Sequence, residues 1–463
     1  MFDANVYIER RNALKDRIQS GIILFPGNIE SPMNYPANTF RFRQDSTFLY
    51  FFGLDNPGLF GFIDVDENKD YMVGDDYTLD DIIWMGPQPT IKHLAHGVGV
   101  ENAVTPAQMA DKIKMAIAQQ RKIHFLPPYR PENSLQLESL LGISAGMLKQ
   151  YASVDLIKAV AALRSVKSDL EIKEIEEALD ISFEMYTAAM QMALPGTCER
   201  EIAGRLEGIA NALGCGMAFP AILSIHGETL HNHHHGNILK KGDLLVVDTG
   251  AESLRHYASD ITRTYPVGGT FTDKQRAIYE IVLNAQQAAI DAIKPDQSFK
   301  DIHMRTALII AEGLKGLGLM KGDMAQAVKE GAHAMFLPHG LGHMMGLDVH
   351  DMEDIGEDYV GYDSTVQRSR QFGLAYLRLA KTLQPGYVLT VEPGIYFIPA
   401  LINKWKAENT GREFINFDRV EEYKDFGGIR IEDNVLVTDD ADGHRVLGKS
   451  IPKTVDEIEA LMN

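Results

Sequence analysis

Two stretches in the second half of the chain carry apolar residues at helical spacing, and each opens with a capping signal. In the first, Ser168 and Glu171 form a capping box, and apolar positions then recur with a helical period as far as Met185. This helix must end by Leu194, because Pro195-Gly196 follows. The second helix opens in the same way at Thr272 and continues until Lys294-Pro295.

We interpret the two helices as parts of one repeated unit. After each proline comes a further helical pattern, ending near Leu213-Gly214 in one case and Leu317-Gly318 in the other, and strand-like sequence follows. A duplication of helix, proline stop, helix and strands predicts a functional site between the two halves.

The N-terminal part has a different pattern. Strand-like runs at 46–52 and 59–65 alternate with helical stretches such as 106–119, which indicates a mixed α/β domain. It gathers no group of ligand-type side chains, so we expect a packing or oligomerisation domain. We place the boundary so that this domain spans 1–160 and a second domain spans 161–463.

Composition narrows the classes of function. The 463 residues carry a net charge of −19, which disfavours nucleic acids and anionic membranes as partners. The two cysteines, Cys198 and Cys215, form no Cys-x-x-Cys pair, which fits a reducing compartment. The first residues lack the apolar core of a signal peptide, and no run approaches the ~18 apolar residues of a membrane span. We therefore expect a cytoplasmic protein that does not enter a membrane.

Two aspartates lie on strands of a predicted hairpin. The run Leu244-Leu-Val-Val-Asp248 and the segment around Asp260-Ile-Thr262 alternate with period two, so Asp248 and Asp260 can face the same cleft. The alternative for each, taken alone, is an aspartate that caps a turn.

Three histidines surround a glycine-rich bend. His339-Gly-Leu-Gly-His343 has the spacing of a helical zinc pair, but its glycines disfavour a helix and the glutamate of a zincin motif is missing. With His350 downstream, the segment is more typical of a wall that faces a substrate. The run His231-Asn-His-His-His235 has the composition of a metal-binding tract, but we interpret it as a polar loop in which one imidazole functions.

Two glutamates end or occupy buried strands. Glu392 follows an apolar run and precedes Pro393-Gly394, and Glu432 lies in the apolar run 429–437. The simpler interpretation of Glu432 is a local pair with Arg430 on the same face of its strand.

Together these segments indicate a metal centre. Carboxylates in apolar, β-branched surroundings require a cationic partner, and two divalent ions would balance four carboxylates if the imidazole is neutral. Oxygen ligands with one imidazole and no thiolate favour Mn2+, Co2+ or Zn2+. The predicted ligands are Asp248, Asp260, His343, Glu392 and Glu432.

These motifs resemble those of the pita-bread metallopeptidases, the family that includes methionine aminopeptidase, aminopeptidase P and prolidase. The resemblance covers 163–463 and extends more weakly to the N-terminal domain through 42–53. It implies an α+β chain with a C-terminal pita-bread domain, a smaller mixed α/β N-terminal domain of the creatinase/aminopeptidase P type, and a homodimer.

The resemblance also implies a role for each predicted ligand. Asp248 is similar to the aspartate that chelates one metal, and His343 and Glu392 to the ligands of the other. Asp260 and Glu432 are similar to the carboxylates that bridge both metals. Asp248 and Asp260 are twelve residues apart where the family suggests eleven, so we expect an extra turn residue or a β-bulge within 251–257.

Other residues match the family's substrate-facing groups. His231, His339 and His350 resemble the histidines that hold substrate and the tetrahedral intermediate, and Arg430 resembles the arginine beside the last ligand. By the same resemblance Glu392 acts as the proton shuttle. The implied reaction is hydrolysis of the bond before proline by water activated between two divalent ions, with Mn2+ preferred over Co2+ or Zn2+.

Within the family, the insertion between 397 and 426 resembles prolidases, which cleave Xaa-Pro dipeptides. Arg378 falls where those enzymes place an arginine that grips the dipeptide carboxylate. The nearest alternative is aminopeptidase P, which acts on longer Xaa-Pro peptides. Metal-free amidinohydrolysis and a non-catalytic binding role are disfavoured, because either should have lost ligands that this chain keeps.

Overall fold

The computed structural model describes residues 1–462, which divide into two compact units. The first unit comprises 1–164 and a separate segment, 352–359; the second comprises 165–351 and the remainder from 360. The chain therefore leaves the second unit after Asp351 and returns to it at Val360.

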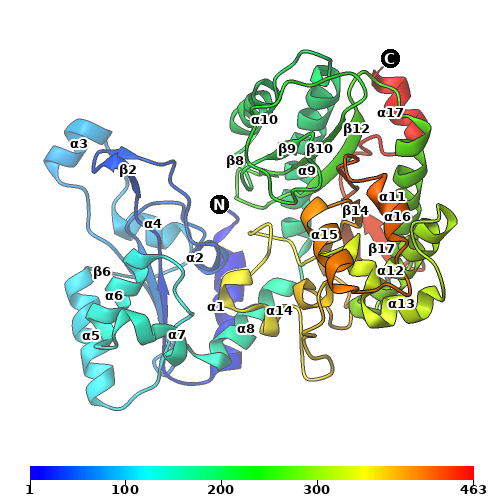
Figure 1. Cartoon of the computed structure of the whole chain (residues 1–463). Helices are drawn as coiled ribbons and strands as arrows, with labels where there is room; N and C mark the ends of the chain where they lie inside the picture. The colour runs from blue at the N-terminus through cyan, green and yellow to red at the C-terminus, as the bar shows by residue number, and fades with distance from the viewer. Residues whose placement is uncertain (463) are drawn as a thin grey trace. The chain divides into compact units, whose positions relative to one another are not determined.

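The first unit is built from short helices and a mixed sheet (Figure 1). Its elements are α1 Ala4–Ile18, β1 Ile22–Pro26, β2 Pro32–Tyr35, β3 Asn38–Thr39, α2 Ser46–Phe52, β4 Phe60–Asp64, β5 Lys69–Val73, α3 Leu79–Met85, α4 Ile91–Gly97, β6 Asn102–Val104, α5 Pro106–Ala118, β7 Ile123–His124, α6 Pro131–Leu141, η1 Ala145–Met147, α7 Leu148–Tyr151 and α8 Val154–Ser165, with η3 Glu353–Ile355 and α14 Glu357–Val360 at the separate segment.

A five-stranded sheet organises this unit, in the order β6-β5-β4-β1-β7. The β1–β4 and β4–β5 pairs are antiparallel, whereas both edge strands pair in parallel. Apolar residues of β1, β4 and β5 form one core with α5 and α6, in which Leu24, Ile113 and Leu137 are fully buried. The strand predicted at 59–65 and the helix predicted at 106–119 are confirmed as β4 and α5.

The strand predicted at 46–52 is wrong, because these residues form helix α2. The Asp45 side chain accepts a hydrogen bond from the Phe48 N–H at 2.8 Å, and Gly53 ends the helix with a φ of 67°. All seven residues are buried. A short helix covered on every side carries an unbroken apolar run, so periodicity cannot separate it from a buried strand.

The second unit contains the long helices and the remaining strands. Its elements are α9 Asp169–Met192, α10 Glu199–Leu213, β8 Gly216–Met217, β9 Ile222–Ser224, β10 Leu244–Thr249, β11 Ala251–Glu252, β12 Ile261–Pro266, α11 Asp273–Asp291, α12 Phe299–Gly316, α13 Met324–Glu330, η2 Ala332–Met335, η4 Leu374–Tyr376, β13 Val388–Val391, β14 Gly394–Tyr396, α15 Pro399–Glu408, α16 Phe417–Glu421, β15 Gly428–Arg430, β16 Asp433–Val437, β17 His444–Val446 and α17 Val455–Met462.

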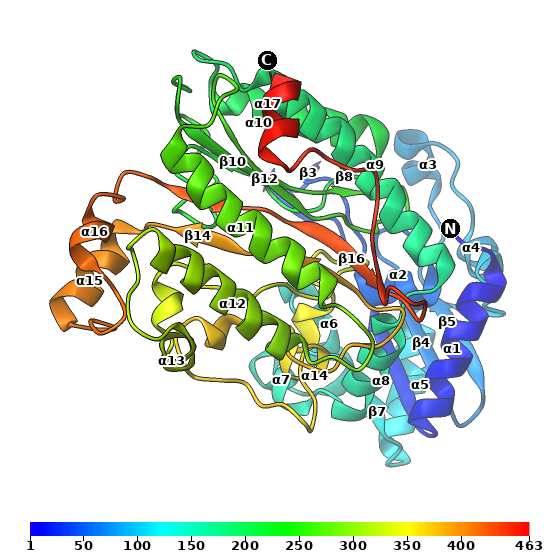
Figure 2. The same ribbon diagram turned by 90° about the vertical axis from the view of Figure 1, so that its right-hand side faces the viewer.

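The predicted helices of the repeated unit are confirmed. The Glu171 carboxylate accepts from the Ser168 N–H at 3.0 Å at the start of α9, and Thr272 and Gln275 cap α11 in the same reciprocal way. α9 packs on α10 and α11 on α12, and Figure 2 shows α11 and α12 lying across one side of the strands. The halves then differ, because strands follow α10 directly whereas α13 and a long irregular segment precede β13.

The strands of both halves meet around the functional residues. β10 lies between β9 and β12, while β16 lies between β13 and β17. An isolated bridge between Thr262 and Glu432 connects the two sheets. The apolar run 429–437 is therefore not one strand: β15 pairs with β14, β16 pairs with β13, and Glu432 lies at the break between them.

The segment with the unexpected spacing, 251–257, forms a small hairpin. β11 pairs with β8, Glu252 is bridged to Ala258, and His256 has a positive φ of 66°. Across residues 1–462, none of the helices is both long enough and apolar enough to pass through a bilayer.

Candidate metal centre and active site

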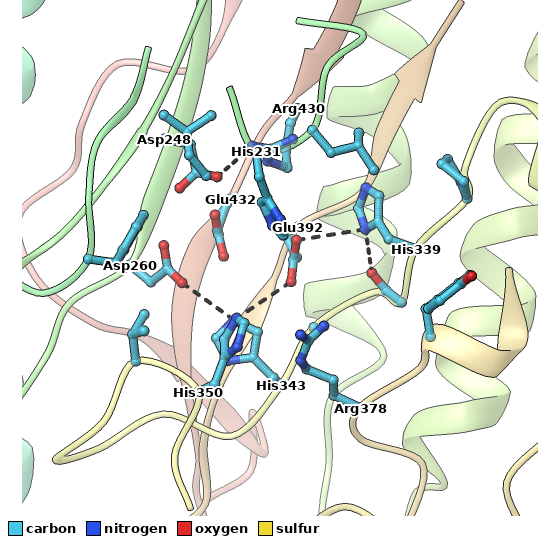
Figure 3. Close-up of a pocket in the computed structure, with 18 of the residues that line it drawn as sticks. His231, Asp248, Asp260, His339, His343, His350, Arg378, Glu392, Arg430 and Glu432 are labelled. Atoms are coloured by element: carbon cyan, nitrogen blue, oxygen red, sulfur yellow. Dashed lines mark hydrogen bonds and ion pairs between the residues drawn. The ribbon is translucent and has the colours of Figure 1, made fainter. Parts of the chain in front are cut away.

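A pocket of about 850 Å³ in the second unit collects the predicted site residues (Figure 3). Its lining includes all ten of them: His231, Asp248, Asp260, His339, His343, His350, Arg378, Glu392, Arg430 and Glu432. The first half of the repeat supplies His231 and both aspartates, and the second half supplies the others. The expectation of a site between the two halves agrees with this arrangement.

Strand register places the carboxylates. Asp248 is paired with Thr262 across the β10–β12 ladder, and Asp260 immediately precedes β12. Asp260 is further fixed by Asn434, whose Oδ1 accepts from the Asp260 N–H at 3.1 Å and whose amide donates to the Asp260 carbonyl at 2.6 Å. The Thr262 hydroxyl donates to Glu432 Oε2 at 2.6 Å. Three carboxylates in or beside separate strands are thereby held in the pocket.

The glycine-rich bend brings His343 against β13. The His343 N–H donates to the Thr390 hydroxyl at 3.1 Å, and the Thr390 N–H donates to the His343 carbonyl at 3.0 Å. A Cβ at Gly342 would lie 2.0 Å from the Thr390 carbonyl oxygen, so only glycine permits this approach.

The imidazole of His343 is oriented as a ligand requires. Its Nδ1 lies 3.0 Å from the Met344 carbonyl, which can only accept, so Nδ1 carries the proton. Nε2 therefore carries no proton, and its lone pair is available to a metal ion. It lies 3.4 Å from Asp260 Oδ2 and 3.7 Å from Glu392 Oε1. A backbone acceptor on the distal nitrogen is the usual support of a metal-ligating histidine.

The residues present fit a divalent metal ion. Ligand atoms of Asp260, His343 and Glu432 all lie within 4.8 Å of one another, and all three residues are buried. Among the described residues, Asp260 Oδ1 is buried without a hydrogen-bond partner, which is costly unless a cation satisfies it. Asp248 and Glu392 line the same pocket and complete the predicted ligand set.

The electrostatics of the cluster also suit a bound cation. Burial raises the pKa of Asp260 and of Glu432 well above the ordinary range, and neighbouring carboxylates add to both increases. Burial likewise raises the pKa of Glu392 to about 7, although His343 and Arg430 oppose the increase. Carboxyls with raised pKa values in a pocket are typical of metal or proton-transfer sites.

Arg430 makes its contacts away from Glu432. Its Nη2 donates to Asp248 Oδ2, its Nε donates to the Thr262 hydroxyl at 3.2 Å, and its Nη1 donates to the Tyr396 hydroxyl at 2.8 Å. The simpler interpretation, a local Arg430–Glu432 pair, is therefore not the arrangement found.

A short hydrogen-bond chain continues from Tyr396 to His339. His339 Nδ1 lies 2.8 Å from the Gly340 carbonyl and so carries the proton, which leaves Nε2 to accept from the Tyr396 hydroxyl at 2.9 Å. Burial lowers the pKa of His339 to about 3, so the ring is neutral. His339 Nδ1 also lies 3.8 Å from Glu392 Oε2.

The other predicted residues surround this centre. The rings of His350 and His343 are 4.3 Å apart between centroids, in a T-shaped contact. Burial and Arg430 lower the pKa of His231. Figure 3 shows Arg378 below Glu392, near His343. The tract 231–235 is a loop, as expected, and His235 Nε2 lies 3.1 Å from the Ala221 carbonyl.

The sequence interpretation missed supporting residues, among them Thr262, Tyr396 and Asn434. Thr262 could have been found, because period two places it on the face of Asp260. Tyr396 and Asn434 give no local signal, because their partners are 34 and 174 residues away in sequence.

Comparisons with known proteins identify the family and the relatives of this chain. Residues 173–439 match metallopeptidase family M24, and residues 7–124 match the aminopeptidase P N-terminal domain. Xaa-Pro dipeptidase of Homo sapiens is 33% identical over 466 residues, covering 96% of this chain and 89% of that protein. Probable Xaa-Pro aminopeptidase pepP of Botryotinia fuckeliana is 32% identical, covering 91% of this chain and 88% of that protein.

Solved structures of aminopeptidase P have the same architecture. Aminopeptidase PepP of Pseudomonas aeruginosa superposes with a TM-score of 0.81 at 27% identity, covering 100% of this chain and 98% of that one. Zn-substituted aminopeptidase P of E. coli in complex with product gives a TM-score of 0.80 at 28% identity, with the same coverage.

The chain therefore belongs to metallopeptidase family M24. The predicted fold class is confirmed: the fold is that of aminopeptidase P, with an N-terminal domain and a C-terminal pita-bread domain. Its relatives include both Xaa-Pro dipeptidases and Xaa-Pro aminopeptidases.

Proposed function

We propose that this metallopeptidase hydrolyses the peptide bond before proline in Xaa-Pro dipeptides, using two divalent metal ions. The observation that carries the proposal is the gathering of Asp260, His343 and Glu432 ligand atoms within 4.8 Å in a pocket that Arg378 also lines. The likeness to Xaa-Pro dipeptidase supports the substrate class.

The proposed metal ligands are those expected from the sequence: Asp248, Asp260, His343, Glu392 and Glu432. Their oxygen-rich chemistry with a single imidazole suits Mn2+ and also accepts Co2+ or Zn2+. When bound, such ions make a coordinated water acidic enough to supply a nucleophile near neutral pH.

The protein's own groups move the proton and bind the developing charge. Glu392 lies 3.7 Å from His343 Nε2 in the pocket; it accepts the proton of the attacking water and returns it to the imino nitrogen of the leaving proline. His231 and His350 are the candidates to donate to the oxyanion, a contribution of about 3 kcal/mol per donor. His339 has both ring nitrogens engaged, so we assign it to orienting Glu392 and Tyr396.

Substrate length depends on Arg378. A dipeptide presents its carboxylate one residue from the scissile bond, and a guanidinium in the same pocket can hold that charge. The proline ring, which has no N–H to satisfy, suits the apolar lining formed by Phe219, Phe372 and Leu401.

The experiment compares Gly-Pro with its C-terminally amidated form. A charge-assisted hydrogen bond is worth about 1.5–3 kcal/mol, so Arg378→Ala should lower kcat/KM on Gly-Pro by roughly 10- to 150-fold. On the amidated substrate it should change little. Lys404→Ala is the matched control, because Lys404 is another cation of the lining and is paired with Glu408.

Equal losses on both substrates, or a wild type that prefers Xaa-Pro-Pro tripeptides, would instead favour Xaa-Pro aminopeptidase activity. That second candidate function is supported by the named relatives and by the lining of the pocket, which also includes Tyr376, Leu401 and Lys404.

We also propose that the protein is a cytoplasmic homodimer. Both cysteines are free thiols, which fits a reducing compartment.

Helix α3 exposes 74% of Leu79, 67% of Ile83 and 85% of Trp84, an apolar surface that a second copy would cover. Light scattering should therefore give twice the chain mass, and Ile83→Asp with Trp84→Ser should give the monomer.

A further inference from the structure

The segment from His343 to Asp351 forms a closed loop whose two ends carry two site histidines. The Asp351 N–H donates to the Met344 carbonyl at 2.9 Å, which closes the loop. The same carbonyl accepts from His343 Nδ1 at 3.0 Å. His350, the neighbour of Asp351, stacks edge-on against the His343 ring. The orientation of both imidazoles is therefore coupled to the position of Asp351.

Asp351 is held by a lysine from a distant part of the chain. Lys167 Nζ lies 2.8 Å from Asp351 Oδ2, and each side chain is only 1% exposed. The space around the pair is filled, because a Cβ at Gly346 would lie 2.7 Å from Asp351 Oδ2 and 2.9 Å from Lys167 Cε. Gly346 in turn accepts, through its carbonyl, from the Ala258 N–H at 2.8 Å.

Lys167 is itself fixed at both ends. Its N–H donates to the Gly386 carbonyl at 2.8 Å, and the next residue, Ser168, begins the capping box of α9. Helix α9 therefore acts as a rigid mount for the Lys167 side chain.

Stability alone does not explain such a pair. The desolvation of two buried charges offsets most of their attraction, and well-packed neutral residues often serve as well or better. What a buried charge-assisted hydrogen bond adds is a fixed distance and direction. Here the direction is transmitted to the loop that carries His343 and His350.

We propose that Lys167 is a positioning residue for the metal and substrate site: through Asp351 it sets the orientation of His343 Nε2 and of His350. This inference rests on the proposed function for the roles of those two histidines. Neither Lys167 nor Asp351 lines the pocket, so they act through the loop rather than on substrate.

The test removes both charges together, so that no buried charge is left unpaired. Lys167→Met with Asp351→Asn should melt within a few degrees of wild type. Its Mn2+ affinity, measured by calorimetry, should fall by about 10-fold, the lower end of what loss of a supporting partner costs a metal site. At saturating Mn2+, kcat on Gly-Pro should fall by about 10-fold or more, with KM changed by less than about 3-fold. The single variant Lys167→Arg keeps the positive charge opposite Asp351. Its losses in Mn2+ affinity and in kcat should therefore be much smaller than those of the double variant.

A control removes a partly buried ion pair that belongs to the other unit, Arg121→Met with Asp64→Asn. This control should leave Mn2+ affinity and kcat unchanged. Wild-type Mn2+ affinity and kcat in the Lys167/Asp351 double variant would overturn the proposal, as would equal losses in the control. If wild type cleaves no Xaa-Pro peptide, the proposed function fails separately, and the Mn2+ affinities still decide the role of Lys167.

Discussion

The two histidines of the glycine-rich bend have the same backbone support but different roles. Both His343 and His339 donate Nδ1–H to a carbonyl of the following residue. His343 Nε2 then faces carboxylates and is available to a metal, whereas His339 Nε2 accepts from Tyr396. Sequence spacing alone made the two residues look alike; the difference comes from Tyr396.

Tyr396→Phe tests this distinction. The variant removes the donor to His339 Nε2 and the acceptor of Arg430 Nη1, but it removes no proposed ligand. We expect metal content to stay at the wild-type level and kcat to fall by about 10-fold, which corresponds to a net effect of about 1.4 kcal/mol from the two lost hydrogen bonds. Tyr423→Phe is the control, since Tyr423 packs against Phe397 in the same unit. A Tyr396→Phe protein without metal would contradict this assignment.

Ionisation of Glu392 should make the free energy of unfolding of the metal-free protein depend on pH. Its pKa is raised to about 7 in the folded chain, so the folded state binds the proton more tightly than the unfolded state. Its contribution to stability therefore falls as pH rises from about 4.5 through 7. Glutamine has no such dependence.

In chelator at pH 8, Glu392→Gln should be more stable than wild type by up to about 3 kcal/mol, and at pH 5 the difference should shrink to about 1 kcal/mol. Urea unfolding at both pH values measures the difference. Glu408→Gln, at a half-exposed position of α15, should show neither effect. A difference that is the same at pH 5 and pH 8 would mean that Glu392 does not titrate in this range.

At the scale of elements, close backbone approach sets the site. The bend 339–343 lies directly on β13, and a Gly342→Ala methyl would meet the Thr390 carbonyl, a backbone atom that cannot rotate away. We expect a loss of about 3 kcal/mol or more in unfolding free energy, together with weaker Mn2+ binding. In contrast, Gly204→Ala in α10 meets no atom within 4 Å and should stabilise by about 0.5–1 kcal/mol. Melting curves and calorimetry on the two variants separate these outcomes.

The elements that the sequence predicted well are those defined by local signals. Capping boxes and proline stops located α9 and α11, and alternation located the β10–β12 hairpin. Prediction failed where local and long-range information diverge: residues 46–52 carry an apolar run that a helix and a strand share, and 429–437 divides because its two parts pair with different strands.

The same limit applies to the site. Each of the ten predicted residues lay in a short segment with its own motif, and the pocket brings all of them together. Lys167 and Asp351 have no motif and are 184 residues apart, so only the folded chain reveals their pairing.

At the scale of the whole molecule, both members of this pair stand next to chain crossings. The chain enters the second unit at Ser165, two residues before Lys167, and leaves it immediately after Asp351. The segment that follows, 352–359, groups with the N-terminal unit, and within it Met352 and Ile355 are buried.

The N-terminal unit consequently cannot be exchanged between proteins as one continuous segment. A recombination event, or a designed chimera, with a single breakpoint near residue 165 would transfer 1–164 but leave 352–359 with its old parent. Chimeras that also exchange 352–359 should be recovered soluble more often than those that exchange 1–164 alone, as expression from matched pairs would show. The gene stretches that encode 1–164 and 352–359 are separated by 187 codons, yet they should be exchanged together between related genes.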